Sequence, residues 1–352
     1  MMQRHSPNAQ RHTNVQRWRV ASLMLAIPFA LAACSPSSPG SDEAEQVSPD
    51  VEIVLGHHHS AGGVFDYQAQ VFADTVDELT AGKIRVVVLS GGQLGSQSEA
   101  ADGVLTGSMD ATIVTSTQFV SVVPQMGIGT LPYVYDGWEH VQTDFIESGV
   151  ADNLETSLAE QGGRILGWGT LGPRNLFFVD GAIDSLADME GLLFRSAAAS
   201  LYQDTFESFG MATVNVTWGE VYSALQTGLA DGLDSPLGAA LDESFDEVTG
   251  GIVVSEHIWG IANIVVNEEL YQGLTDEQQD ALKEAGAKAS KAGTERARED
   301  YEGATAKFEQ AGLKIHELSD QDLSDMRAGT VAIVDEWVEE NNAEELISKI
   351  RG

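Results

Sequence analysis

The sequence predicts an α/β protein in which two lobes share hinge strands, and three observations lead to this class. Short apolar runs alternate with segments of helical periodicity over residues 51–171, a pattern typical of a largely parallel sheet. The alternation returns over residues 172–235. The β-type stretch GIVVSEHIWGIANIVV then begins at Gly251 and is long enough to return to the first sheet. Two units joined by more than one crossing form a hinge with a cleft, and ligands bind there outside the carboxyl ends of the strands.

The first unit is predicted from hydrophobic spacing. VEIVLG, which begins at Val51, is a short apolar strand, and apolar residues from Val64 to Leu79 continue at roughly helical spacing until Gly82. The elements expected next are, in order, the strand KIRVVVLS, a helix over 96–106, the strand MDATIV, a loop through GTLPYVY, a helix after residue 136 and the strand RILGWG.

The second unit follows the same pattern and leads into a long helical region. Its expected elements are the strand RNLFFV, the helical turn SLADMEG, the strand LLFRS, a helix over 200–209, the strand TVNV, a helix over 219–228 and the strand ADGLDS. Thr275 and Gln278 predict a capping box for a helix that reaches about Gln310. At 1.5 Å per residue this helix is ~50 Å long, enough to brace both lobes. Ser319 and Asp322 begin a last helix, whose main apolar positions are Met326, Val331, Val334 and Val338.

The first 33 residues have the composition of a secretory signal peptide. They contain four arginines and no acid, and end in the apolar run VASLMLAIPFALAA. That run is too short for a membrane-spanning helix, which needs ~20 residues. It leads into Leu-Ala-Ala-Cys34, which resembles the lipobox of bacterial lipoproteins and implies lipidation of Cys34. Residues 34–50 are rich in Ser, Pro and acids and are predicted to form a flexible tether.

Composition excludes some classes of site and partner. Cys34 is the only cysteine, which excludes an intrachain disulfide and a thiolate metal cluster. Removal of residues 1–33 takes away four arginines and lowers the formal charge from −35 to −39. A surface of that charge repels nucleic acid and anionic lipid headgroups. An anionic ligand therefore needs a locally placed cation.

Arg195 is a candidate for that cation. It ends an apolar strand and precedes Ser196 and three alanines, small residues that let a ligand approach. The planar guanidinium matches a carboxylate with two hydrogen bonds, which lysine cannot do. The alternative is an arginine turned to solvent at the end of a strand.

Six motifs over residues 51–310 are shared with a known family. They are LGHHHSAGG, GGQLGSQSE, GSMDATIV, TLPYVY, EGLLFRS and TWGEVYSALQTGLADG. Together they resemble the solute-binding proteins of TRAP transporters, the DctP-like family, and the stretch over 219–232 is the most specific. The resemblance implies a two-lobed periplasmic-binding-protein fold that closes on an organic anion and delivers it to a membrane permease driven by an ion gradient. It implies neither catalysis nor a cofactor.

The resemblance also implies ligand-binding roles in the second lobe. The family's carboxylate-binding arginine falls on Arg195, and a second arginine of the family site falls on Arg174. The alternative for Arg174 is a place at the rim, paired with one of the many acids. An aromatic residue that faces the ligand falls on Trp218. Many members have Gln-Glu-Asn-Pro where this chain has Leu-Asp-Ser-Pro. Ser235 therefore keeps a hydroxyl without the amide, and Asp234 favours a ligand with hydroxyls or a cationic group.

Three consecutive histidines, His57 to His59, lie in the first lobe. Consecutive residues at the end of a strand point to alternate faces, so at most two converge on one point, whereas zinc takes three or four ligands. The family's first loop borders the ligand, so we expect His58 or His59 to hydrogen-bond to it; a merely solvated histidine run is the alternative. Glu99, at the end of GGQLGSQSE, completes the predicted site, and no metal is expected.

Rival functions make different demands on these residues. A zinc-binding lipoprotein of a metal importer would explain the histidines but has no use for Arg195. An enzyme is not expected, because a nucleophile elbow, a phosphate loop and a helical His-Glu-x-x-His pattern are absent from the sequence. A receptor that reports the ligand to a sensor kinase would share every residue named above.

The preferred interpretation is a periplasmic or extracytoplasmic receptor, anchored through Cys34, for a dicarboxylate, sugar acid, keto acid or ectoine-like solute. Sialic acid is less favoured, because the family's polar set for it is not matched at Thr115 or Ser235. We expect lobe one to comprise residues 51–171 with 261–300, and lobe two residues 172–260 with 301–352. Closure of the lobes would exclude water and strengthen the ion pair with Arg195.

Overall fold

The computed structural model describes residues 49–351. The predicted signal peptide, Cys34 and the tether up to residue 48 lie outside the described residues. One sheet organises the described chain, with strand order β2-β1-β3-β8-β4-β7-β5-β6, and β9 pairs with β8 beside this path. The strands are β1 (Val51–His57), β2 (Ile84–Leu89), β3 (Ala111–Thr115), β4 (Gly163–Phe178), β5 (Leu193–Ser196), β6 (Ala212–Asn215), β7 (Gly232–Pro236), β8 (Gly251–Asn267) and β9 (Lys314–His316).

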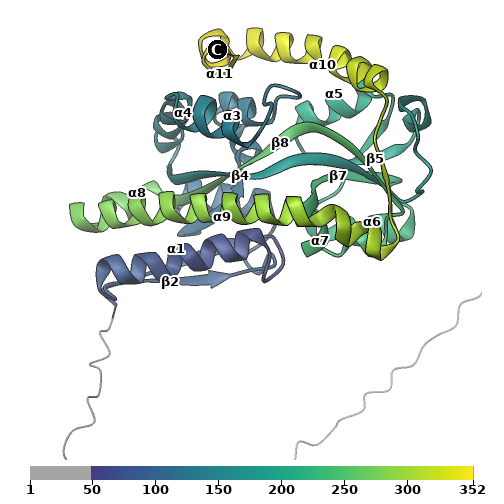
Figure 1. The fold of residues 1–352 in the computed structure, drawn as a ribbon. Helices are drawn as coiled ribbons and strands as arrows, with labels where there is room; N and C mark the ends of the chain where they lie inside the picture. Colours follow the sequence, from purple (N-terminus) through teal and green to yellow (C-terminus); the bar gives the residue numbers. More distant parts are fainter. Residues whose placement is uncertain (1–48, 352) are drawn as a thin grey trace, which may run out of the picture. The chain divides into compact units, whose positions relative to one another are not determined.

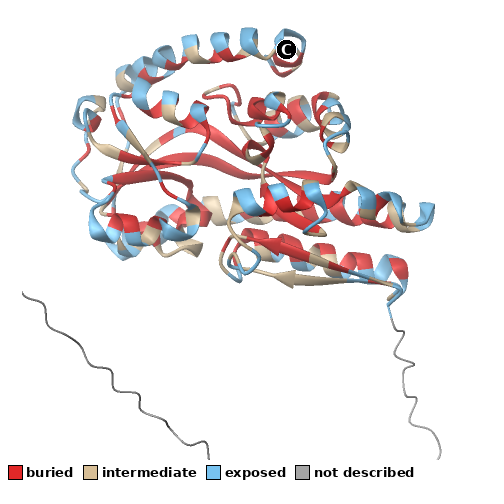
Figure 2. Ribbon diagram, turned by 180° about the vertical axis from the view of Figure 1, so that it is seen from behind, coloured by how far each residue is buried: buried red, intermediate tan, exposed pale blue. Residues whose placement is uncertain are grey.

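Two parallel groups of strands flank a pair of long antiparallel strands (Figure 1). In the first half of the sheet β1 is parallel to β2 and β3. In the second half β5 is parallel to β6 and β7. Residues 262–266 of β8 pair with β3, whereas residues 174–178 of β4 pair with β7, so β4 and β8 each run through both halves of the sheet. Both are buried along most of their length (Figure 2). The predicted two-lobed α/β architecture with hinge strands is confirmed.

The prediction that RILGWG and RNLFFV form separate strands is wrong. Both belong to β4, because the intervening Thr-Leu-Gly-Pro does not form a turn. Gly172 has a φ of +86°, and the pairing with β8 shifts register between Thr170 and Pro173. A bulge of this kind bends a strand without ending it.

Helices cover both faces of the sheet, and the core of the described chain comprises four apolar clusters. Within residues 49–351 no helix is both long and apolar enough to cross a bilayer. The helices are α1 (Val64–Thr80), α2 (Gln97–Thr106), α3 (Trp138–His140), α4 (Val150–Ala159), α5 (Ser200–Ser208), α6 (Val221–Thr227), α7 (Leu237–Asp242), α8 (Glu268–Gln272), α9 (Asp276–Ala311), α10 (Asp320–Glu340) and α11 (Glu344–Arg351).

The long helix α9 braces both halves, as predicted. The Thr275–Gln278 capping box is present at its N-terminus. Ala289 packs in the apolar cluster that contains β1 and α1, whereas Phe308 lies with its ring centroid 5.5 Å from that of Phe177 on β4. A Cβ placed on Gly286 would lie 2.4 Å from the carbonyl oxygen of Leu166 on β4, so helix and strand meet at backbone distance.

The last two helices connect the halves a second time. Ser319 caps α10 by accepting a hydrogen bond from the Asp322 amide, as predicted. Met326 packs with α5 of the second half, whereas Trp337 and Ile347 belong to an apolar cluster of the first half. The predicted apolar position Val331 is 55% exposed, because Thr330 takes the inward place on this turn.

Candidate ligand-binding site

The carboxyl ends of the parallel strands from both halves meet at one cleft. β1 and β3 of the first half and β5 and β6 of the second end there. A pocket of 320 Å³ adjoins an inner cavity of 30 Å³, and the larger volume is within the range of small-molecule sites. The polar side chains around these two spaces include Gln97, Gln118, Arg174, Arg195, Asn215 and Trp218.

Arg195 lines both spaces and is buried, with 4% of its surface exposed. Its Nε donates to the Val216 carbonyl oxygen at 2.9 Å, and its guanidinium lies 5.5 Å from the ring centroid of Trp218. No carboxylate of residues 49–351 lies within 4 Å of it. Burial lowers the pKa of Arg195 to about 10, which leaves it charged at neutral pH. The site therefore holds a desolvated cation without a protein counter-ion.

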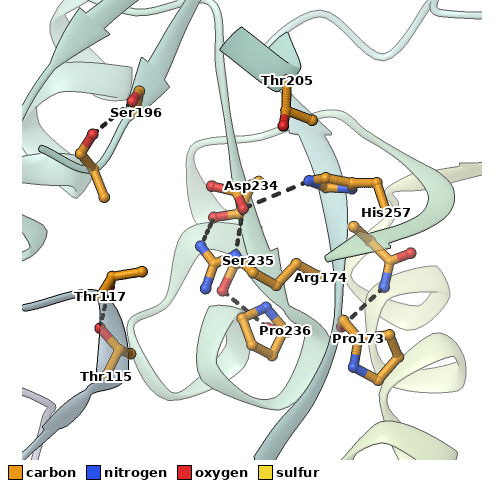
Figure 3. A network of polar contacts seen from close by, with 12 residues as sticks. Thr115, Thr117, Pro173, Arg174, Ser196, Thr205, Asp234, Ser235, Pro236 and His257 are labelled. Atoms are coloured by element: carbon orange, nitrogen blue, oxygen red, sulfur yellow. Dashed lines mark hydrogen bonds and ion pairs between the residues drawn. The ribbon is translucent and has the colours of Figure 1, made fainter. Parts of the chain in front are cut away.

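Arg174 lines only the inner cavity and has a counter-ion of its own (Figure 3). Its Nε pairs with Asp234 Oδ2, and its Nη2 donates to the Asp234 main-chain oxygen at 2.8 Å. His257 Nε2 lies 3.7 Å from the same carboxylate. Burial alone would raise the pKa of Asp234, but Arg174 and His257 hold it well below its usual range. Asp234 is fully buried, lines neither space, and serves as an internal partner of Arg174.

The histidines form an aromatic wall with Trp218. The ring of His59 stacks on Trp218 with 5.2 Å between centroids and 11° between planes, and His58 lies edge-on to both. Burial lowers the pKa of His58 to about 3 and that of His59 well below its ordinary value, so both are neutral. His58 and His59 line the inner cavity, and a buried Nδ1 of each has no hydrogen-bond partner among the described residues.

His57 faces elsewhere, with its Nε2 3.3 Å from Asp66 Oδ1 in helix α1. The three imidazoles thus divide between two environments, with His58 and His59 together and His57 apart. Strand alternation would instead place His57 with His59, but β1 ends at His57, so the alternation does not continue through the next two residues. Within the described chain no three His, Cys, Asp or Glu side chains are arranged to hold a metal ion.

Besides Asp234, two more predicted site residues do not line the cleft. Ser235 is fully buried, and its hydroxyl donates to the Pro236 carbonyl oxygen at 2.9 Å. Glu99 is exposed and caps helix α2, where it accepts hydrogen bonds from the amide and hydroxyl of Ser96 at 2.7 and 2.8 Å. Ser-x-x-Glu is a capping-box sequence, so this local role was visible in the motif.

The sequence interpretation missed polar residues that follow the strands. Gln97 accepts hydrogen bonds from the Thr115 amide and hydroxyl at 3.0 and 2.9 Å, which leaves its NH₂ group for the cleft. Gln118 follows β3, and Asn215 ends β6 opposite Ser196 of β5. Their position at the carboxyl ends of strands was the available signal.

A larger pocket of 640 Å³ lies between α4, β4 and α9, away from this cleft. Its cations are paired on the surface, since Arg298 has carboxylate oxygens of Glu139 and Glu302 within 4 Å. Trp168 Nε1 donates to Glu155 at 2.8 Å in its wall. We place the ligand site in the cleft because, over residues 49–351, it combines converging strand ends with a buried, uncompensated cation, which the larger pocket lacks.

Acidic side chains of α7 and the residue after it join the two halves beside the cleft. Glu243 accepts hydrogen bonds from the amide and hydroxyl of Ser60 at 3.0 and 2.8 Å, and Asp242 accepts one from the Val64 amide at 3.2 Å. Both acids lie at the N-terminus of α1, where the helix dipole favours negative charge. The two halves are thus in contact beside the cleft.

Comparisons with known proteins agree with this architecture. The model of the DctP family, described as bacterial extracellular solute-binding protein family 7, matches residues 55–341. A solute-binding protein of Roseobacter denitrificans is 27% identical over 242 residues, which are 68% of this chain and 73% of that protein.

Solved structures also resemble the chain in fold. The sugar acid binding protein DctPAm of Advenella mimigardefordensis, in complex with galactonate, has a TM-score of 0.82 at 21% identity and covers 87% of this chain and 99% of that one. A TRAP periplasmic solute binding protein of a Polaromonas species, bound to D-erythronate, has a TM-score of 0.82 at 20% identity and covers 86% and 98%. The resemblance that the motifs indicated is confirmed, and the chain belongs to the bacterial extracellular solute-binding proteins of family 7.

Proposed function

We propose that this protein captures a small organic carboxylate outside the cytoplasm and delivers it to the membrane permease of a TRAP transporter. Its family is one of solute-binding proteins and not a class of enzymes. The two structural neighbours named above hold galactonate and D-erythronate, both sugar acids, and these complexes support a carboxylate ligand here.

One observation carries the proposal. Arg195 is buried in the cleft with a single main-chain hydrogen bond, and no carboxylate among the described residues lies within 4 Å of it. A buried charge is costly unless it is paired and hydrogen-bonded. A ligand carboxylate supplies both the charge and the acceptor oxygens, and its two oxygens match the remaining guanidinium N–H groups.

The contacts between the halves add a means of closure. When Glu243 binds Ser60, the cleft is shielded from water, and the ion pair between ligand and Arg195 strengthens as the local dielectric falls. Opening about β4 and β8 would release the ligand to the permease. We propose lobe boundaries at residues 171 and 261 for the sheet, with α9 and α10 each spanning both lobes.

Retention at the membrane is proposed to depend on Cys34. The chain carries no other cysteine, so lipidation there would be the sole thiol-linked anchor. Detergent phase partition of the Cys34→Ser variant tests this proposal. Transfer of the protein from the detergent phase to the aqueous phase is expected, and equal partition of variant and wild type would contradict anchoring.

A thermal-shift screen tests the binding function. The purified protein is screened against sugar acids, keto acids, dicarboxylates, ectoine and Zn²⁺, in parallel with the Arg195→Met variant. We expect at least one carboxylate to raise the melting temperature of the wild type and to leave that of the variant unchanged. Stabilisation by zinc alone, equal in both proteins, would contradict the proposal and favour the metal-binding alternative.

A further inference from the structure

The two arginines of the site differ in their ion pairing, and this difference limits the charge of the ligand. Arg174 is neutralised by Asp234, which is fully buried and held between Arg174 and His257 (Figure 3). Arg195 has no such partner. The described residues that line the cleft pocket and the inner cavity include neither an acid nor a third lysine or arginine. The site therefore offers one uncompensated positive charge.

Asp234 cannot easily release Arg174 to a ligand. It lies on β7 with its backbone paired to Leu176 of β4, and Arg174 is held both at the carboxylate and at the main-chain oxygen of the same residue. A ligand carboxylate that displaced Asp234 from Arg174 would leave a buried acid without its partner, which is strongly destabilising.

The rest of the cleft is lined by neutral polar groups. Gln97, Gln118 and Asn215 border the 320 Å³ pocket. Trp218 Nε1 and the Nδ1 atoms of His58 and His59 are buried without hydrogen-bond partners among the described residues. These groups suit hydroxyls or carbonyls of a ligand, whereas a second carboxylate would be desolvated there without a cation.

From this arrangement, and resting on the proposed carboxylate-binding function, we propose that the site is selective for monocarboxylates whose remaining groups are neutral and polar, and rejects dicarboxylates of the same size. The selectivity is carried by Asp234, which occupies Arg174 and so removes the second cation. Rejection by an unpaired, desolvated charge is a recognised way to gain specificity.

The test compares ligands that differ only in the second carboxylate. Calorimetric titrations of the purified protein use D-gluconate with D-glucarate, D-galactonate with D-galactarate, and 4-hydroxybutyrate with succinate. In each pair a terminal CH₂OH is replaced by a carboxylate. We expect the monocarboxylate of at least one pair to bind at least tenfold more tightly than its dicarboxylate. Equal or tighter binding of the dicarboxylates would overturn the selectivity and leave the proposed function standing, whereas no binding in any pair would contradict the carboxylate function itself.

An Asp234→Asn variant provides the second measurement, because it leaves Arg174 without its counter-ion. We expect the ratio of dicarboxylate to monocarboxylate affinity to rise at least tenfold. Asp74→Asn, which removes an equal charge from an exposed position on α1, is the matched control and should leave the ratio unchanged. An unchanged ratio in a folded Asp234→Asn variant would overturn the role of Asp234. If that variant does not fold, the wild-type ratios still decide the proposal.

Discussion

Replacement of Arg195 by methionine should abolish ligand binding without harming the fold. The side chain is 4% exposed and makes one hydrogen bond to a main-chain oxygen, and no carboxylate in the part of the chain that the structure describes lies within 4 Å of it. In the complex its partner would be the ligand. Truncating one side of a buried, hydrogen-bonded charge pair costs about 2–5 kcal/mol, or roughly 30-fold to several thousand-fold in Kd. A micromolar ligand would then bind in the millimolar range or not measurably.

The same substitution should not lower the stability of the unliganded protein. A lone buried cation destabilises the fold, so Arg195→Met is expected to keep or raise the melting temperature without ligand. Arg174→Met is the matched control, because it leaves Asp234 buried without its partner and should lower stability by about 3–5 kcal/mol. Calorimetric titration with the most stabilising carboxylate, together with thermal unfolding of both variants, measures these effects. A Kd change below threefold, or a loss of stability in Arg195→Met as large as that in Arg174→Met, would refute the reasoning.

Other predictions concern closure, packing and pH. Glu243→Ala removes two hydrogen bonds to Ser60 and should raise the ligand Kd about tenfold, mainly through faster ligand dissociation. Stopped-flow experiments measure the dissociation rate. An unchanged rate would show that this contact does not hold the closed state. Gly286→Ala should destabilise the fold by about 1–3 kcal/mol, because its Cβ would meet a backbone oxygen at 2.4 Å. Gly303→Ala on the same helix has open space around it and should stabilise the fold by about 0.5–1 kcal/mol. Denaturant titrations measure both changes, and equal effects would contradict the close contact at Gly286. The buried histidines have folded-state pKa values below 6.5, so they take up protons on unfolding, and stability should fall as pH drops from about 6.5 towards 5. His58→Asn should reduce that slope by up to about 1.4 kcal/mol per pH unit, and a slope that stays the same would place the proton uptake elsewhere.

The local signals in the sequence were sufficient for most of the architecture. Alternating periodicity predicted two α/β units, and the length of the stretch after Gly251 predicted a strand that returns to the first sheet. The cap of α9 depends on neighbours three residues apart, which a sequence displays directly. The break predicted between Gly169 and Arg174 is wrong, because Gly172 and Pro173 suit a turn and a bulge equally well. Only the pairing with β8 selects the bulge.

In the candidate site, too, some features were predictable from the sequence and others depended on the tertiary structure. The sequence by itself determined that Arg195 lies at the end of a strand among small residues, because the apolar run and the alanines around it are visible directly. It did not determine that His58 and His59 share the cavity, because β1 ends at His57 and the chain beyond it no longer alternates between faces. It did not determine which arginine is free, since Arg174 and Asp234 are 60 positions apart and meet only through the antiparallel register of β4 and β7. The tertiary structure decided that one cation is compensated and the other is not, because the net charge of a buried site is set by the segments that pack together there.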